Sequence, residues 1–168
     1  MLFSPMPSKA LRRAETSDAS GLTFGDVCDR YLIEYLGKID MPDGPRWTGQ
    51  HVRPRTAEDG WYHLNITRKV VVPAGNGQHV CLERKPFAAV STLDVRTVQA
   101  ERRPHGPVGC NRLMARLRHL FNWSIEEGMI DRTPFKRGDV SLVKLDTNAE
   151  KERTRRLQPG ERARLLQH

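Results

Sequence analysis

The stretch CNRLMARLRHLFNWSIEEGMIDRTPF, residues 110–135, carries the clearest helical pattern in the chain. Its apolar residues recur on one face at helical spacing, which predicts a single amphipathic helix. Gly128 follows where a left-handed C-terminal cap is favoured, and Pro134 lies beyond it. One flank of the apolar face carries Arg112, Arg116, His119 and Trp123. Such a cationic flank is typical either of an ordinary solvated surface or of a helix that lies against phosphates.

The overall charge favours a polyanionic partner. The chain has 168 residues with 28 Lys and Arg against 20 Asp and Glu, a formal net charge of +8. Hydrophobic residues make up 38% and charged residues 29%, a composition typical of a globular protein. Each phosphate that a basic side chain neutralises releases condensed counterions, so nucleic acid is the favoured partner. A solvated basic surface is the alternative interpretation.

Cysteine and histidine usage predicts neither a disulfide framework nor a metal site. The three cysteines include no C-x-x-C pair, and no histidine stands at ligand spacing from a cysteine. A reducing cytoplasm fits this pattern best. No apolar run approaches the length of a membrane span. We therefore expect a cytoplasmic protein with no metal, no cofactor, no membrane partner and no small-molecule substrate.

Three further helices are predicted from their starts. Each start has a hydroxyl residue followed three residues later by an aspartate, the pattern of a capping box: Thr23 with Asp26, Thr56 with Asp59, and Ser91 with Asp94. The expected helices cover residues 23–36, 57–69 and 92–103. Gly37 is placed to end the first, and Gly60 weakens the pattern of the second by about 1 kcal/mol relative to Ala.

The remaining segments are expected to be loops, linkers and termini. Residues 38–55 show no periodicity and contain several Pro and Gly residues, which predicts a long loop. A short β-hairpin is a candidate for residues 70–72 and 79–82. Residues 1–21 are expected to form a flexible basic arm, and the charged residues 136–156 a linker with too few apolar side chains for a core. A last helix start follows at residues 157–168, with Pro159 at the first helical position. The fold class predicted is therefore mainly all-α, with four helices in residues 22–135, long loops and flexible termini.

The order of these elements resembles the N-terminal core-binding (SAM-like) domain of phage integrases, the tyrosine recombinase family. The resemblance spans roughly residues 22–168. Four stretches resemble the family's helix starts: T-F-x-x-V-x-x-x-Y-L at 23–32, R-P-R-T at 53–56, P-F-A-A-V-S-T-L-D-V at 86–95, and N-R-L-x-x-x-L-R-x-L-F-N-W-S-I-x-x-G-M-I-D-R-T-P-F at 111–135. L-Q-P-G-E-R-A-R-L-L at 157–166 resembles the beginning of the catalytic domain. The chain departs from the family at its longer first loop, at Gly60, where an aromatic residue is expected, and at residues 77–85, which look like an insertion.

The resemblance implies a fold, a partner and a set of contacts. The fold would be the family's four-helix SAM-like bundle, and the function would be DNA binding in DNA integration and site-specific recombination. Double-stranded DNA would be the partner, and other recombinase protomers are further candidates. The second and fourth helices would lie near the major groove, which is wide enough for one helix. Carried over to this chain, the DNA-binding candidates are Arg53, Arg55, Thr56, His63, Arg68, Asn111, Arg112, Arg116 and His119.

The chemistry of the family is not expected from this chain. The family's catalytic domain supplies arginines, a lysine, a His-x-x-Arg motif and a nucleophilic tyrosine, whereas this sequence contains no His-x-x-Arg. Tyr31 and Tyr35 lie on the apolar stripe of the first helix, and Tyr62 has no catalytic context around it. The expectation is a truncated, non-enzymatic core-binding domain.

Two alternatives stay open at this point. One is a stand-alone regulator that occupies a recombination site without cutting DNA. The other is a helical protein–protein interaction module with a basic surface, anchored by the three tryptophans Trp47, Trp61 and Trp123.

Overall fold

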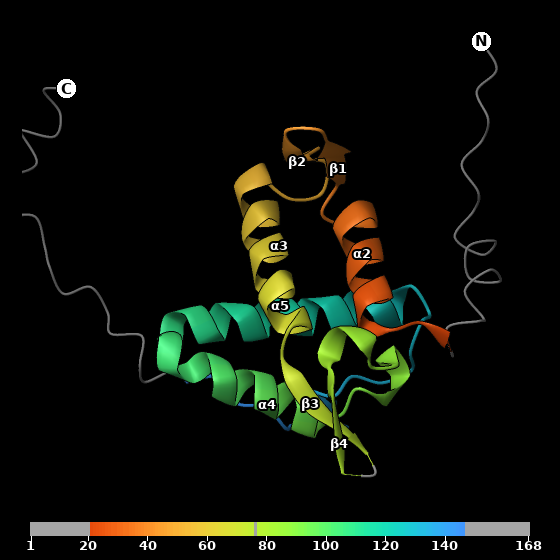
Figure 1. Ribbon diagram of the computed structural model, residues 1–168, viewed down its shortest axis with the longest axis vertical. Helices are drawn as coiled ribbons and strands as arrows, with labels where there is room; N and C mark the ends of the chain where they lie inside the picture. Colours follow the sequence, from red (N-terminus) through yellow and green to blue (C-terminus); the bar gives the residue numbers. More distant parts are fainter. Residues whose placement is uncertain (1–20, 76, 147–168) are drawn as a thin grey trace, which may run out of the picture.

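The computed structural model describes residues 21–75 and 77–146, and within them the fold is mainly α. Four helices carry the core: α2 (Phe24–Glu34), α3 (Pro54–Arg68), α4 (Thr92–Arg102) and α5 (Pro107–Glu126). Three antiparallel two-stranded hairpins accompany them: β1 (Lys38–Met41) with β2 (Gly44–Trp47), β3 (Val71–Gly75) with β4 (Gln78–Cys81), and β5 (Lys136–Arg137) with β6 (Val140–Ser141). Short 3₁₀ turns are η2 (Leu82–Arg84), η3 (Phe87–Ala89) and η4 (Arg103–His105). Figure 1 shows α2 and α3 standing side by side on one side of the long α5, with α4 along its other side.

Helix α2 begins as its sequence predicts. The Thr23 hydroxyl accepts a hydrogen bond from the Asp26 amide at 3.2 Å, and the Asp26 carboxylate accepts one from the Thr23 amide at 2.8 Å. This reciprocal capping box satisfies amide donors that the first helical turn leaves unpaired. The apolar stripe of the helix lies in the core, where Phe24, Val27 and Tyr31 are fully buried.

Helix α3 starts earlier than predicted, and the capping box expected at Thr56 and Asp59 is wrong. The helix begins at Pro54, its N-cap residue is Arg53, and no side chain caps it. Proline suits the first helical position because it has no amide hydrogen to leave unpaired and its φ is already helical. Thr56 therefore lies inside the first turn, where its amide donates to the Arg53 carbonyl at 2.8 Å.

The long loop predicted for residues 38–55 is also corrected. Residues 38–47 form the β1–β2 hairpin, in which Lys38 pairs with Trp47 and Met41 with Gly44. Both strands are largely exposed, so the alternation of buried and exposed residues that would have indicated strands is missing. The base of the hairpin is closed by a bond from the Thr48 amide to the Gly37 carbonyl. Gly37 has φ +71°, and a Cβ there would lie 2.0 Å from the Thr48 hydroxyl oxygen, so only glycine fits.

The segment between α3 and α4 agrees with its prediction. Strands β3 and β4 form the hairpin that residues 70–72 and 79–82 suggested, with Val72 fully buried. Helix α4 begins with the capping box of Ser91 and Asp94 and ends at Arg102, one residue before the expected end.

Helix α5 is longer than its apolar pattern alone indicated. It begins at Pro107, three residues before the predicted stretch, and Gly106 is its N-cap residue with φ +113°. Its buried face supplies the centre of the core with Leu113, Leu117, Leu120 and Phe121. Gly128 has φ +75° just beyond the helix, as a left-handed cap requires, and the Met129 amide bonds back to the Ser124 carbonyl at 2.9 Å.

The interpretation of residues 136–156 as a linker is wrong for their first part. Val143 is only 1% exposed and joins the core with Phe135, and the Leu142 amide donates to the Phe135 carbonyl at 2.8 Å. Apolar residues are sparse here, but a few suffice because they fill a groove that α4 and α5 have already formed. The predicted arm at residues 1–20, the rest of the linker and the helix start at 157–168 lie outside the described residues.

Candidate nucleic-acid interface

Helices α3 and α5 lie against each other at Gly60. A Cβ on Gly60 would be 3.0 Å from Leu36 Cδ1 and 3.1 Å from Arg116 Nε, so these side chains would have to shift to admit a larger residue. Arg116 also donates a hydrogen bond to the Thr56 carbonyl at 3.2 Å. The close approach at Gly60 and the Arg116–Thr56 bond bring the first turns of α3 beside α5.

The exposed part of this surface is cationic. Arg53, Arg55 and Thr56 are exposed at the start of α3, and Arg112 is exposed on α5. The side chains of Arg53, Arg55 and Arg112 make no hydrogen bond or ion pair with any residue that the structure describes. They are thus available for a ligand. The positive end of the α3 dipole adds to their attraction for an anion.

A shallow open hollow lies between the two helices. It has a volume of about 380 Å³ and is lined by Asp59, Arg112, Ala115, Arg116 and His119. Asp59 is the single acid among the lining residues, and its carboxylate lies 3.5 Å from His63 Nε2. Two arginines against one aspartate leave the hollow net positive, so it favours an anionic ligand.

His119 is held in place by an aromatic partner. Its Nδ1 lies 2.9 Å from the Tyr31 hydroxyl, and the two form a hydrogen bond. Burial, and after it the charge of Arg116, lower the pKa of His119 below its ordinary value, so the ring is neutral at pH 7. Burial also raises the pKa of Tyr31 to about 12, which keeps its phenol protonated. His119 is therefore a braced, neutral group on the edge of the cationic surface.

Stacked rings connect this surface to the core. Tyr35 stacks on the His51 ring, with centroids 5.9 Å apart, and on Tyr31 at 5.1 Å. Trp123 meets Tyr31 edge-on at 5.3 Å and is itself buried, so it belongs to the core. Sequence reasoning placed Tyr31 and Tyr35 only on an apolar stripe; their spacing of four residues on one helix face was the available signal for a stacked pair. The rings hold the segment that precedes α3 against α2 and α5.

Three predicted contacts occupy interior positions instead. His63 is 4% exposed, and burial lowers its pKa. Arg68 forms an ion pair with Asp29 and donates to the Gly25 carbonyl at 2.9 Å. Asn111 is 7% exposed, and its amide bonds to the main chain of Asp146. The structure therefore gives these three residues packing and tethering roles.

The remaining observations concern metal sites, membrane-spanning helices and similarity to known proteins. No group of three or more His, Cys, Asp or Glu in the described residues could hold a metal ion. Among those same residues, no helix is both long enough and apolar enough to cross a membrane. Comparisons of the chain with protein-family models, curated proteins and solved structures found no match.

Proposed function

We propose that this chain is the DNA-binding, core-binding domain of an integrase-like tyrosine recombinase, with the four-helix SAM-like bundle of that family. It would hold duplex DNA during integration or site-specific recombination without cutting it. The proposal rests on the order of the four sequence motifs and on the cationic surface where α3 and α5 meet. Its mainly α fold is compatible with such a bundle.

The observation that supports the proposal most is the position of three exposed arginines, paired with no described residue, at the start of α3 and on the adjoining α5. Arg53 and Arg55 at the start of α3 suit backbone phosphates, since both the dipole and the guanidinium groups attract anions. Arg112 on α5 is exposed and suits either a phosphate or a guanine edge. Arg116, bound to the Thr56 carbonyl, would keep the two helices in register.

The described tyrosines lack the surroundings for nucleophilic chemistry. Tyr62 is exposed, but no described residue hydrogen-bonds to its hydroxyl, and Tyr35 stacks on Tyr31 and His51. Tyr31 is buried, with its pKa raised to about 12, and hydrogen-bonds to His119. Attack on a phosphodiester needs an accessible phenol with an activating base and charge-stabilising groups around it. We therefore expect no covalent adduct between this chain and a nicked suicide duplex.

Salt dependence of DNA binding tests the proposal. Three phosphate contacts predict that the logarithm of the binding constant falls with the logarithm of salt concentration with a slope of about −2.7, a loss of about 40-fold between about 50 and 200 mM salt. The assay is fluorescence anisotropy of a labelled duplex titrated with the full chain. Replacing Arg53, Arg55 and Arg112 by Gln is expected to remove most of this slope.

A matched variant controls for net charge. Arg84, Arg132 and Arg137 are exposed elsewhere on the molecule, and replacing all three by Gln removes the same charge. This control is expected to keep most of the affinity and most of the slope. Undetectable binding at low salt, or binding that salt does not weaken, would refute a DNA-binding role. Equal losses in both variants would show unspecific attraction and reject the α3–α5 surface.

A further inference from the structure

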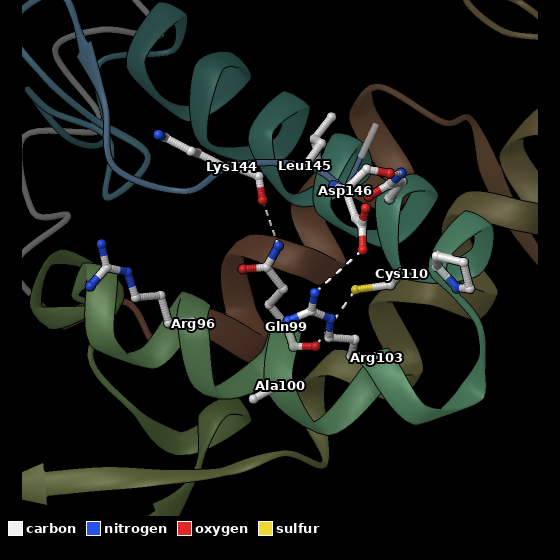
Figure 2. A pocket seen from close by; sticks show the side chains of 10 residues that line it. Arg96, Gln99, Ala100, Arg103, Cys110, Lys144, Leu145 and Asp146 are labelled. Carbon is white, nitrogen blue, oxygen red and sulfur yellow. Dashed lines mark hydrogen bonds and ion pairs between the residues drawn. The ribbon is translucent and has the colours of Figure 1, made fainter. Parts of the chain in front are cut away.

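The segment 142–146, here called the strap, is held in a groove between α4 and α5 by side chains that bind its main chain. Arg96 donates to the Leu142 carbonyl at 2.9 Å, and Gln99 donates to the Lys144 carbonyl at 2.8 Å. Arg118 donates to the Val143 carbonyl at 3.3 Å. Figure 2 shows the Gln99 bond, with the strap on one side of a hollow and α4 on the other.

Asn111 completes this set of contacts from the first part of α5. Its amide nitrogen donates to the Asp146 carbonyl at 3.0 Å, and its amide oxygen accepts from the Asp146 amide at 3.1 Å. Arg103 adds an exposed ion pair to the Asp146 carboxylate at 3.3 Å. Because most of these bonds reach backbone atoms, the groove recognises an extended chain more than it recognises particular side chains.

The side chains of the strap add a simple apolar pattern. Val143 is buried in the core and Leu145 is partly buried against it, whereas Lys144 between them is exposed. Alternation of this kind is what an extended segment shows when every second side chain enters a groove. The groove therefore fits an extended peptide with apolar residues two positions apart.

The strap borders a hollow and follows a small exposed hairpin. A hollow of about 380 Å³ remains beside it, lined by residues that include Ala100, Cys110 and Leu145. On its N-terminal side, residues 136–141 are exposed, and their β5–β6 pairing covers only two residues in each strand around Gly138. If this small hairpin opened, its six residues could span up to about 20 Å. The strap could then leave its groove while the core of Leu113, Leu117 and Leu120 stayed packed.

We propose that the α4–α5 groove is a docking site for an extended chain, and that the strap of a second copy of this protein occupies it when two copies assemble. The strap itself is the ligand that the structure shows to fit, and an exchanged strap would make the same main-chain bonds in the partner's groove. Exchange of an identical element in this way is a low-cost route to a dimer. The strap of the same chain competes at an effective concentration in the millimolar range, so exchange requires two copies held close together or a concentrated solution.

Cross-linking between different chains tests the exchange. Ala100 on α4 and Lys144 on the strap are both exposed and line the same hollow. One chain carries Ala100→Cys and the other Lys144→Cys, both with Cys81→Ser because Cys81 is an exposed thiol whereas Cys28 and Cys110 are buried. A short bismaleimide joins the two new thiols across chains efficiently when the strap of one copy lies in the groove of the other, because both thiols then line one hollow. We expect a cross-linked heterodimer whose yield rises with protein concentration and falls when a peptide of residues 139–147 is added.

One strap variant, one control variant outside the strap and one double-cysteine chain make the outcome decisive. Val143→Asp in the strap-labelled chain is expected to lower the heterodimer yield at least threefold, while Val140→Asp at an exposed position leaves it unchanged. A chain with both new cysteines reports the strap in its own groove. If that chain links internally but no heterodimer forms at any concentration, the strap is not exchanged and the proposal is overturned. If neither link forms, the strap does not occupy the groove in solution, which overturns it as well.

Discussion

The contact between Lys85 and Asp94 predicts a large loss of stability when Asp94 is truncated. Lys85 Nζ lies 2.9 and 2.8 Å from the two carboxylate oxygens of Asp94 and also donates to the Pro73 carbonyl at 2.7 Å. The carboxylate additionally accepts from the Ser91 amide at 2.7 Å as part of the α4 capping box. The side chain of Asp94 is 1% exposed and that of Lys85 is 11% exposed. One carboxylate thus ties the β3–β4 hairpin, η2 and the start of α4 together.

The expected cost of Asp94→Ala follows from the burial of both partners. Removing one member of a buried ion pair leaves an uncompensated charge and costs about 3–5 kcal/mol. Loss of the capping box adds about 1 kcal/mol. The sum is about 4–6 kcal/mol, a large share of the roughly 5–15 kcal/mol that stabilises a typical domain.

Urea denaturation followed by far-ultraviolet circular dichroism measures this free energy of unfolding. Asp26→Ala is the matched control, because Asp26 completes the same kind of box on α2 at an exposed position without a buried lysine. It is expected to cost about 1 kcal/mol. Lys85→Met combined with Asp94→Ala removes the orphaned charge and is expected to recover most of the loss. If Asp94→Ala and Asp26→Ala proved equally mild, the buried pair would contribute nothing and the reasoning would be refuted.

Three further predictions concern stability. Val143→Ala is expected to destabilise the protein by about 2 kcal/mol, against less than about 0.5 kcal/mol for the exposed Val140→Ala, measured by urea denaturation. Burial lowers the pKa of both His63 and His119, so the unfolded chain binds more protons than the folded chain at acidic pH. The contribution of these two rings to stability is therefore complete above about pH 6.5 and falls as the pH is lowered below that value. Urea denaturation at about pH 7.5 and about pH 5.5 measures the difference. A higher free energy of unfolding at about pH 5.5 than at about pH 7.5 would contradict the burial of these rings. Gly37→Ala is expected to lower the free energy of unfolding by about 1–3 kcal/mol, because Gly37 has a positive φ and a Cβ there would clash with Thr48. An unchanged melting temperature would argue against the observed base of the β1–β2 hairpin.

Local chemistry let the sequence predict several elements correctly. The capping boxes of α2 and α4 join residues three positions apart, so neither depends on distant parts of the chain. The apolar face of α5 and the left-handed cap at Gly128 are likewise local patterns. Exposure of Arg53, Arg55 and Arg112 also follows the expected cationic surface. Their proposed role on DNA stays a prediction.

Neighbours in space, not in sequence, decide the features that the sequence could not predict. His63, Arg68 and Asn111 have the residue types of DNA contacts, but distant segments such as that of Asp29 and that of Asp146 occupy or bury them. Helix α3 begins at Pro54, and the capping pattern at Thr56, two residues later, could not show that the helix had already begun.

The sequence by itself determined that four helices form and that one flank of the last is cationic, because periodicity, caps and charge are properties of short stretches of chain. Only the tertiary structure decided which basic side chains remain free for a ligand and that residues 142–146 complete the domain. Both depend on packing between segments far apart in sequence: Gly60 lets α3 approach α5 beside Arg116, and the groove between α4 and α5 buries a single valine, Val143, that composition alone would assign to a linker.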